Sequence, residues 1–443
     1  MWPSTPYPDG MVRLLLSVLC WCVASVGQAP PKVVSMTPRN GGTVAPGVTE
    51  LVVTFDQDMS RRGYSVCGGG PAFPKIEGRP KWPRDRKLVI PVRLQPDHEY
   101  ELSLNCASAR KIQSKAGTSL TPTKWSFTTL PAKLRPWPEQ QQRNRDTFDR
   151  LQALLQSSYA YRDRVVADWT SLLGEQGARL LQARTDRAFA KAAAALLEAA
   201  RDQHVSVRYK DRVYATEQTL VEPLYRTFAT RRLFDLEQVS TRVFRGSTDD
   251  GIGYLMITGW QADVDPERLL GAIAEMMSMK ALILDVRPNL GGDEQIARRV
   301  ASWFVKGEKV YAKHQSIGPD GLGEVQERKV VGNEETFSRP TVVLTGPRVM
   351  SSCESFVLMM KQADGVQIVG QKTRGSSGNP VEHDLGNGVR VQLPSWRALR
   401  PDGSCFEGEG IQPDVHVPCT SRDLQEGEPT LQKALELLRQ RIK

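Results

Sequence analysis

Several kinds of sequence signal are missing from this chain of 443 residues. Beyond residue 30, no apolar run approaches the roughly 20 residues that a membrane-spanning helix needs. No CxxC or HExxH spacing occurs, so no pattern argues for a metal ion or another cofactor. The formal charge of +9 is modest, and no Lys/Arg run is long enough to indicate a nucleic-acid partner. What remains is ordinary globular composition, at a length that predicts two or three domains.

The N-terminus carries the one marked apolar run. Arg13 precedes the segment Leu14–Ala24, and the small residues Gly27 and Ala29 stand where signal peptidase reads the chain. This pattern predicts a secretory signal peptide over residues 1–29. The alternative is an uncleaved anchor, for which the run is short. We therefore expect an exported protein, located in the periplasm, the cell envelope or the medium.

Five cysteines follow the predicted cleavage site. An oxidising compartment permits the bridges Cys67–Cys106 and Cys405–Cys419, which leaves Cys353 as a buried free thiol. We expect this pairing in the folded protein.

Residues 30–131 predict an all-β module. Short alternating runs, separated by Pro, Gly, Asn and Asp, indicate a β-sandwich, with strands at Glu50–Phe55, Lys87–Val92, Tyr100–Leu104 and Trp125–Thr129. The segments 53–59, 94–100 and 125–129 resemble those of bacterial immunoglobulin-like modules. Such a resemblance implies a spacer or an adhesive surface rather than chemistry.

A Pro-rich linker follows, and residues 132–210 predict a helical subdomain. Apolar residues recur there at three- and four-residue spacing, as in Phe148, Leu151, Leu155 and Tyr159. The helical pattern ends at a polar turn that contains His204 and leads into a short strand. A histidine in such a turn can point into a cleft, although a surface position is the commoner outcome.

Residues 211–443 alternate strands with helices and predict an α/β layered domain. The strands are expected at Tyr254–Ile257, Ala281–Arg287, Thr341–Leu344 and Gln367–Gly370, with a late hairpin strand at Val389–Leu393. The helices are expected over residues 266–279, 294–304 and 352–362. Continuous apolar strands are typical of a sheet that is covered on both faces.

One strand of this domain leads through a sharp turn to Ser351 and then to a helix. Free backbone N–H groups and the positive end of the helix dipole lie at such a turn. That environment suits a nucleophile whose attack creates an oxyanion. The alternative is a helix N-cap, in which Ser351 and Glu354 form a capping box.

Three further features supply what a nucleophilic serine needs. The pair Gly291-Gly292 allows close backbone approach and offers N–H donors. His204 is a candidate base near neutral pH, and Glu407, in a Gly-rich loop, is a carboxylate that could orient it. These residues form a triad-like set if the fold brings them together.

Four sequence blocks resemble those of C-terminal-processing (tail-specific) serine peptidases. Residues 284–292 resemble the Leu-Asp-Leu-Arg-x-Asn-x-Gly-Gly signature, and residues 350–354 resemble the nucleophile turn Phe-Ser-Ala-Ala-Glu. Residues 369–375 and 407–414 are similar to the next two blocks, in the same order. The resemblance spans about residues 140–420 and implies a crotonase-like (ClpP/crotonase) α/β core that hydrolyses peptide bonds.

Two features depart from the tail-specific branch. That branch pairs its serine with a lysine, and the corresponding position here is Ser376. The interval between Tyr209 and Gly253 is also too short for a peptide-binding PDZ module. Both departures favour the branch that resembles the tricorn protease core.

The tricorn-like branch uses serine, histidine and a carboxylate. The resemblance therefore implies that Ser351 is the nucleophile, His204 the base and Glu407 the residue that orients the base. It also implies that the backbone N–H groups of Gly292 and Ser352 bind the oxyanion.

The archetype has an assisting serine just before its histidine, and this chain has Gln203 there. Candidates for the assisting role are Gln203, Ser376 and Glu409, and Asp202 and Ser206 lie near enough in sequence to be considered. Glu409 is also the alternative to Glu407 as orienting acid.

The sequence thus predicts an exported serine peptidase that acts on a peptide or protein substrate and has no cofactor. The alternative is a catalytically inactive ligand- or peptide-binding protein on the same fold, because a fold alone does not secure activity. A third interpretation makes the β-module the functional part, as an envelope adhesive. Nothing in the sequence indicates the substrate or the oligomeric state.

Overall fold

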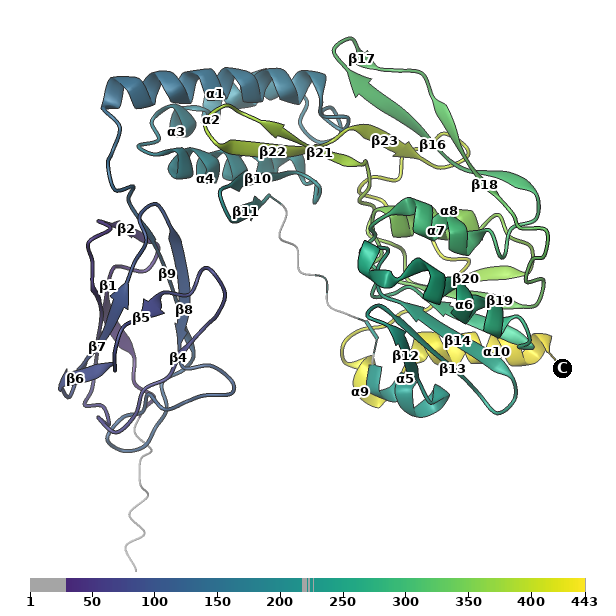
Figure 1. The fold of residues 1–443 in the computed structure, drawn as a ribbon, viewed down its shortest axis with the longest axis horizontal. Helices are drawn as coiled ribbons and strands as arrows, with labels where there is room; N and C mark the ends of the chain where they lie inside the picture. The colour runs from purple at the N-terminus through teal and green to yellow at the C-terminus, as the bar shows by residue number, and fades with distance from the viewer. Residues whose placement is uncertain (1–28, 217–220, 222–223, 226, 443) are drawn as a thin grey trace, which may run out of the picture. The chain divides into compact units, whose positions relative to one another are not determined.

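The computed structural model describes residues 29–216, 221, 224–225 and 227–442. Nearly all of the predicted signal peptide, residues 1–29, lies outside the described residues. The chain forms two compact units, Met1–Leu134 and Arg135–Lys443 (Figure 1). Among the described residues, no helix is long and apolar enough to cross a membrane.

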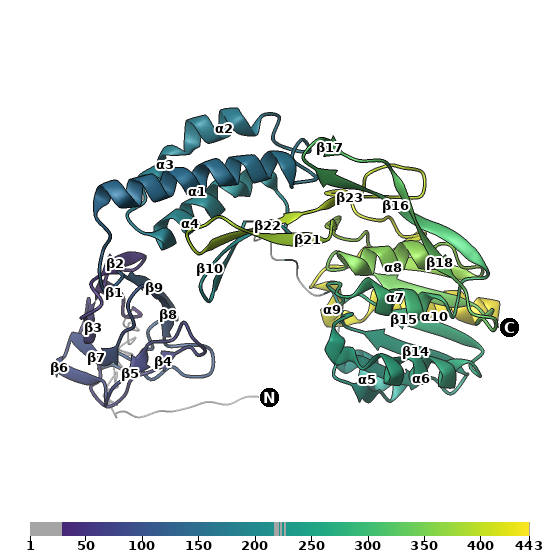
Figure 2. The ribbon, with the colours of Figure 1, turned by 45° about the horizontal axis from the view of Figure 1, so that its top comes forward.

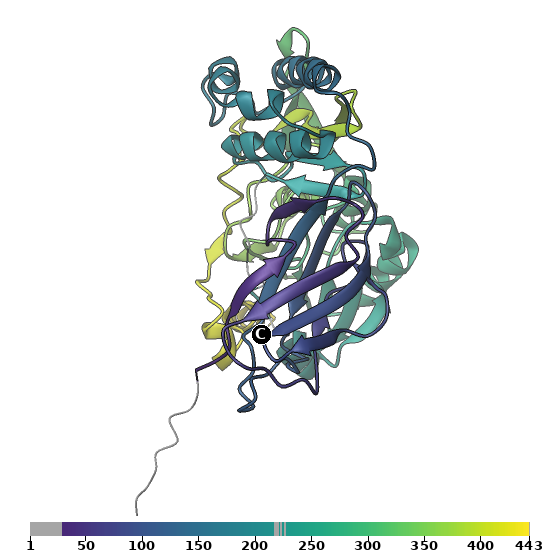
Figure 3. The same ribbon diagram turned by 90° about the vertical axis from the view of Figure 1, so that its left-hand side faces the viewer.

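The first unit is a sandwich of two sheets (Figure 3). One sheet has the order β1-β3-β7-β5, with β6 paired to β7, and the other has the order β2-β9-β8-β4. The bounds are β1 Val33–Thr37, β2 Gly42–Val44, β3 Glu50–Phe55, β4 Val66–Cys67, β5 Lys75–Ile76, β6 Lys81–Arg84, β7 Lys87–Arg93, β8 Glu99–Leu104 and β9 Thr123–Thr129. Alternate residues of β3 and β7 are buried in the core around Trp125, as the period-two pattern predicts. The predicted β-sandwich is confirmed.

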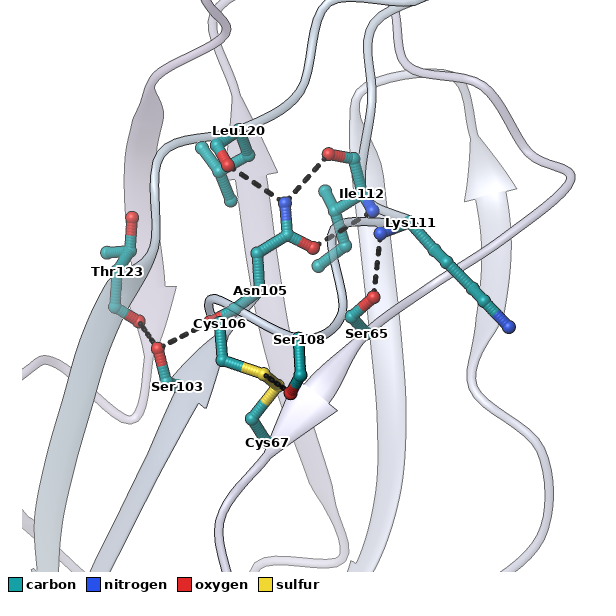
Figure 4. Close-up of a disulfide and its surroundings, with 10 residues drawn as sticks. All are labelled: Ser65, Cys67, Ser103, Asn105, Cys106, Ser108, Lys111, Ile112, Leu120 and Thr123. Atoms are coloured by element: carbon teal, nitrogen blue, oxygen red, sulfur yellow. Dashed lines mark hydrogen bonds between the residues drawn. A yellow bond between two sulfur atoms is a disulfide. The ribbon is translucent and has the colours of Figure 1, made fainter. Parts of the chain in front are cut away.

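A disulfide joins Cys67 to Cys106 in this unit, with their Cα atoms 6.2 Å apart (Figure 4). Beside it, the buried Asn105 side chain donates to the carbonyls of Ile112 and Leu120 and accepts from the Ile112 N–H. This predicted bridge is confirmed, and so is the free, buried Cys353.

The predicted Cys405–Cys419 bridge is wrong, because both thiols are free. The two residues pack in different surroundings. Cys405 lies against the apolar cluster of the helical part, whereas Cys419 lines a small cavity beside Arg287. The prediction failed because it paired Cys405 with Cys419 only on the ground that they are close in sequence.

Reduction should destabilise the first unit by about 4 kcal/mol, because the bridge closes a loop over a sequence separation of 39 residues. Hydrogen exchange of the β3 and β7 amides, with and without reductant, measures this change. As a control, the variant that combines Cys405→Ser with Cys419→Ser should leave those amides unchanged. Equal protection in both redox states would contradict the expectation.

The second unit is built on a seven-stranded sheet of order β12-β13-β14-β15-β19-β20-β24. Strands β14, β15, β19, β20 and β24 are parallel, and β12 and β13 pair antiparallel at one edge. The bounds are β12 Glu237–Ser240, β13 Val243–Ser247, β14 Ile252–Ile257, β15 Ala281–Asp285, β19 Thr341–Thr345, β20 Val366–Gly370 and β24 Val415–His416. Every residue of β14, β15 and β19 is buried. The predicted α/β core is confirmed.

Helices cover both faces of this sheet (Figure 2). Helices α6 Pro266–Met276, α7 Glu294–Ala301 and α8 Ser352–Met360 pack on one face. Helices α5 Thr227–Phe234 and α10 Pro429–Arg441 lie on the other, and α9 spans Asp423–Glu426. Alternate strand residues face the two helical layers, as expected for a buried parallel sheet.

The helical segment does not stand alone. Helices α1 Trp137–Ser157, α2 Trp169–Gln176, α3 Ala178–Leu181 and α4 Asp186–Leu197 pack with a small antiparallel sheet of order β11-β10-β22-β21. Its strands are β10 Ser206–Tyr209, β11 Arg212–Ala215, β21 Pro380–Asp384 and β22 Val389–Pro394. The boundary predicted at residue 210 therefore falls inside the second compact unit.

A long hairpin extends from the core, formed by β16 Glu308–Gly318 and β18 Gln326–Val331, with β17 Gly321–Leu322 at its tip (Figure 1). Strand β23, Trp396–Leu399, pairs with the other edge of β16.

Candidate active site

Ser351 occupies the turn between β19 and α8, as the strand–turn–helix pattern predicts. Its backbone has φ 56° and ψ −134°, a conformation that a residue with a side chain rarely adopts. A strained strand-to-helix turn is typical of a nucleophilic serine, because it lifts the hydroxyl away from the helix. The Ser351 hydroxyl makes no capping hydrogen bond to α8, so the alternative of a capping box is wrong.

Glu354 binds the loop formed by residues 373–376 through its carboxylate. Its fully buried carboxylate accepts hydrogen bonds from the N–H groups of Gly375 (2.7 Å) and Ser376 (2.9 Å) and from the Thr373 hydroxyl. Burial raises the pKa of Glu354 to about 7, although these donors act in the opposite direction. The carboxylate fixes the loop 373–376 against α8, directly beside Ser351.

Ser376 joins the nucleophile turn to the histidine. Its backbone carbonyl accepts the Ser351 N–H at 2.6 Å, and its side-chain oxygen lies 2.9 Å from Nδ1 of His204. Ser376 itself is buried, with 2% of its surface exposed. Because one residue contacts both, Ser351 and His204 lie at the same site.

The turn before β10 places His204. The His204 N–H donates to the Asp202 carboxylate at 2.9 Å, and the other oxygen of that carboxylate accepts the Tyr159 hydroxyl at 3.0 Å. Strand β10 is in turn held by β22, with Ser206 opposite Gln392. Burial lowers the pKa of His204 to about 4, so its imidazole is neutral at neutral pH.

Glu407 contacts the same loop from another direction. Its carboxylate is buried and accepts the Ser377 N–H at 2.8 Å, next to the residue that contacts His204. Burial and then the charge of Asp202 raise the pKa of Glu407 well above its ordinary value. Burial likewise raises the pKa of Asp202 to about 6. Two buried carboxyl groups, those of Asp202 and Glu407, therefore lie near His204 and interact with each other.

The structure separates the three candidates for the assisting role. Ser376 contacts the His204 ring directly. Glu409 has an exposed side chain that pairs with Arg400 at 3.1 Å. The Gln203 side chain is partly exposed and forms no hydrogen bond in the described part of the chain. Of these three side chains, Ser376 is therefore the one that the structure places in contact with the histidine.

The backbone at Gly291 is held on both sides. Its N–H donates to Asn289 Oδ1 at 2.8 Å. Its carbonyl accepts two hydrogen bonds, from the Trp260 N–H at 3.0 Å and from Gln261 Nε2 at 3.1 Å. The sequence analysis did not predict these three hydrogen bonds to Gly291, although the Asn-x-Gly-Gly motif contains both partners of the bond between Asn289 and Gly291.

Two backbone N–H groups remain for an oxyanion. The Gly292 carbonyl accepts the Ser352 hydroxyl at 2.9 Å, whereas the N–H groups of Gly292 and Ser352 have no partner within the described ranges. A Cβ atom on Gly291 would lie 2.8 Å from Ser351 Cβ, so these donors approach the serine closely. Ser352 is buried, whereas Gly292 is exposed, so the Ser352 amide departs from the rule that buried backbone groups are nearly always paired, and the Gly292 amide is open to a bound ligand.

Asp285 and Arg287 form an ion pair near the start of this loop. Arg287 binds Asp285 at 2.6 Å and Glu428 at 2.8 Å, and the Tyr254 hydroxyl donates to Asp285 at 2.6 Å. All of these side chains are buried. The cluster supports the end of β15. Among the described residues, no group of three His, Cys, Asp or Glu side chains is placed to hold a metal.

Comparison with known proteins identifies two segments of the chain. Residues 251–417 match the sequence profile of peptidase family S41, and residues 27–129 match that of a bacterial Ig-like domain. The chain therefore contains an S41 peptidase domain preceded by an Ig-like domain. Ser351 and Glu407 lie inside the S41 match, whereas His204 precedes it.

One curated relative is the carboxy-terminal processing protease CtpA of Bacillus subtilis, with 27% identity over 179 residues. The alignment covers 39% of this chain and about a third, 36%, of that relative. A solved structure of a protein assigned as a peptidase from Parabacteroides merdae has 22% identity and a TM-score of 0.60, over 67% of this chain and 96% of that one. At that identity, the likeness shows the fold.

The tricorn protease is also among the structural neighbours. Its identity is 13% and its TM-score 0.43, over 89% of this chain and 46% of the tricorn chain. A likeness of this size carries no argument about the site, so the assignment of residues rests on the contacts described above.

Proposed function

We propose that this chain, which carries an S41 peptidase domain, is an exported serine peptidase with Ser351 as nucleophile and His204 as general base. The observation that carries the proposal is the double contact of Ser376, which brings the strained serine turn and the neutral histidine to one place. Glu407 belongs to the same set through the adjacent Ser377 amide.

The proposed reaction is acyl transfer to water. His204 takes the Ser351 proton while Oγ bonds to the peptide carbonyl carbon, and the N–H groups of Gly292 and Ser352 stabilise the oxyanion. The C–N bond then breaks, and His204 returns the proton to the leaving amine. Water next attacks the acyl-enzyme with His204 as base, and the products are a free acid and regenerated Ser351.

Ser376 is the proposed assisting residue. Its oxygen contacts Nδ1 of His204, which leaves Nε2 as the nitrogen that serves Ser351. Glu407 acts on this arrangement through the loop rather than by a direct bond to the ring. In the proposed site, the Ser376 hydroxyl therefore contacts the histidine, and the Glu407 carboxylate holds the backbone of the adjacent Ser377.

Export fits the Cys67–Cys106 disulfide, since such bridges persist in oxidising compartments. The substrate is proposed to be a peptide or protein, in keeping with the chemistry of the site.

A fluorophosphonate probe tests the proposal, because it phosphonylates an activated serine. Mass spectrometry should find the label on Ser351 and not on Ser352, Ser376 or Ser377. Replacing Ser376 with alanine should slow labelling about 10-fold without moving the labelled residue, because Ser376 orients the base. A folded protein without label would instead favour the inactive binding protein, and label on Ser376 would assign the nucleophile to that residue.

The rate of labelling should depend on pH through His204. The base must be unprotonated, and burial lowers its pKa to about 4, whereas an exposed histidine titrates near about 6.5. The labelling rate should therefore stay constant as the pH falls to about 6, and it should fall to half only at about pH 4. Rates measured across this range, with circular dichroism to verify folding at each pH, check the midpoint. A midpoint at or above about 6.5 would contradict the burial argument.

A further inference from the structure

The Gly292 N–H can serve an oxyanion only if its peptide group keeps one orientation. We infer that the Gln261 side chain and the Ser352 hydroxyl are positioning residues. Gln261 holds this peptide and Ser352 holds the peptide that follows it, so that the glycine loop keeps the oxyanion-binding orientation. This inference rests on the proposed peptidase function and assigns two residues that the family resemblance does not.

The argument begins with the peptide that joins Gly291 to Gly292. A trans peptide is planar, so its carbonyl and its N–H point in opposite directions. The Gly291 carbonyl is gripped by the Trp260 N–H at 3.0 Å and by Gln261 Nε2 at 3.1 Å. Holding the carbonyl on one side fixes the Gly292 N–H on the other.

The Ser352 hydroxyl holds the next peptide. It donates to the Gly292 carbonyl at 2.9 Å, and the Ser352 N–H is the second free amide. One residue thus supplies a donor for the oxyanion and also ties the glycine loop to the start of α8. The spacing between the two free amides is set by this tie.

Glycine makes such clamps necessary. Gly291 and Gly292 have φ values of 99° and 134°, and glycine passes readily between many backbone conformations. Without side-chain clamps, the loop could rotate its amide away from the serine. Preorganised donors stabilise a developing charge because they need no reorganisation during the reaction.

Gln261 holds this position at a cost. Its Oε1 atom is buried and has no hydrogen-bond partner among the described residues, which opposes folding. The single Nε2 contact to Gly291 does not explain such a placement by stability alone. A role in orienting the glycine peptide does explain it.

The test uses the full chain and a fluorophosphonate probe. Ser351 Oγ bonds to phosphorus, the P–F bond breaks, fluoride leaves and His204 takes the serine proton, while charge develops on the phosphoryl oxygen in the proposed oxyanion site. The variants are Ser352→Ala and Gln261→Met, which remove one clamp each. The matched control is Ser355→Ala, the same change in the same helix, at a buried serine whose side chain forms no hydrogen bond to Gly291 or Gly292 among the described residues.

Each clamp variant should lower the maximal labelling rate about 10-fold, less than the loss of a whole oxyanion donor. The probe concentration that gives half this rate should stay within about twofold, because binding precedes charge development. Ser355→Ala should change neither quantity. Unchanged maximal rates in both clamp variants, or an equal loss in the control, would overturn the inference while leaving the peptidase proposal intact. If the wild-type protein is not labelled at Ser351, the proposed function fails and the inference fails with it.

Discussion

Replacing His204 with glutamine should lower the rate of peptide hydrolysis about 10⁴- to 10⁶-fold, as expected when a triad loses its base. Glutamine keeps a polar side chain of similar length but cannot accept the Ser351 proton and return it to the leaving amine. Hydrolysis of a quenched peptide library by the purified chain, at substrate concentrations below saturation, measures the loss. Circular dichroism should show that the variant remains folded.

His416 offers the matched control, because it is exposed on β24 at the edge of the sheet. The His416→Gln variant should hydrolyse the library as fast as the wild type. A double variant, His204→Gln with Ser351→Ala, should be no slower than either single variant, since residues that act as a unit are not additive. Residual activity within about 10-fold of wild type in His204→Gln would rule out the general-base role.

Replacing Arg287 with methionine should destabilise the second unit by about 3–5 kcal/mol. Arg287 is 3% exposed and binds two carboxylates, Asp285 and Glu428, which are 0% and 4% exposed. Methionine fills part of the volume but leaves both negative charges buried without their partner. Breaking such a cluster costs much more than an ordinary hydrogen bond, since desolvated charges remain. Urea unfolding, followed by tryptophan fluorescence, measures the change.

Arg299 provides the comparison for this experiment. It pairs with Glu267 at 2.8 Å, but the two side chains are 49% and 80% exposed. The Arg299→Met variant should therefore change the free energy of unfolding by less than about 0.5 kcal/mol. Similar losses in the two variants would show that burial of the Asp285–Arg287–Glu428 cluster does not carry the effect.

Much of the fold followed from local pattern. Continuous apolar runs predicted β15 and β19, and alternation predicted β3 and β7, because strand burial has a simple signature in each case. The Ser351 turn was also visible, since a strand, a Gly-Pro breaker and a helix succeed one another there. These features depend on residues that are neighbours in the sequence, so they can be predicted from one sequence alone.

The rest depends on contacts between distant segments. No local signal shows that β22 pairs with β10 as well as with β21, or that Gln261 reaches the carbonyl of Gly291. The contact of Ser376 with His204 was one candidate among several, because the family pattern places its assisting serine elsewhere. The incorrect Cys405–Cys419 pairing has the same origin, since cysteine spacing carries no information about which cluster each thiol joins.

The pairing of β10 with β22 has a consequence for the time at which hydrolytic competence arises. Strand β10, which directly follows the proposed base His204, meets a partner 186 residues further along, at Ser206 and Gln392. A polypeptide that has been synthesised or translocated only as far as a residue before β22 lacks the strand that pairs with β10 and so holds His204 in position. We therefore expect the producing cell to be spared premature cleavage of its own polypeptides until nearly the whole chain has been delivered.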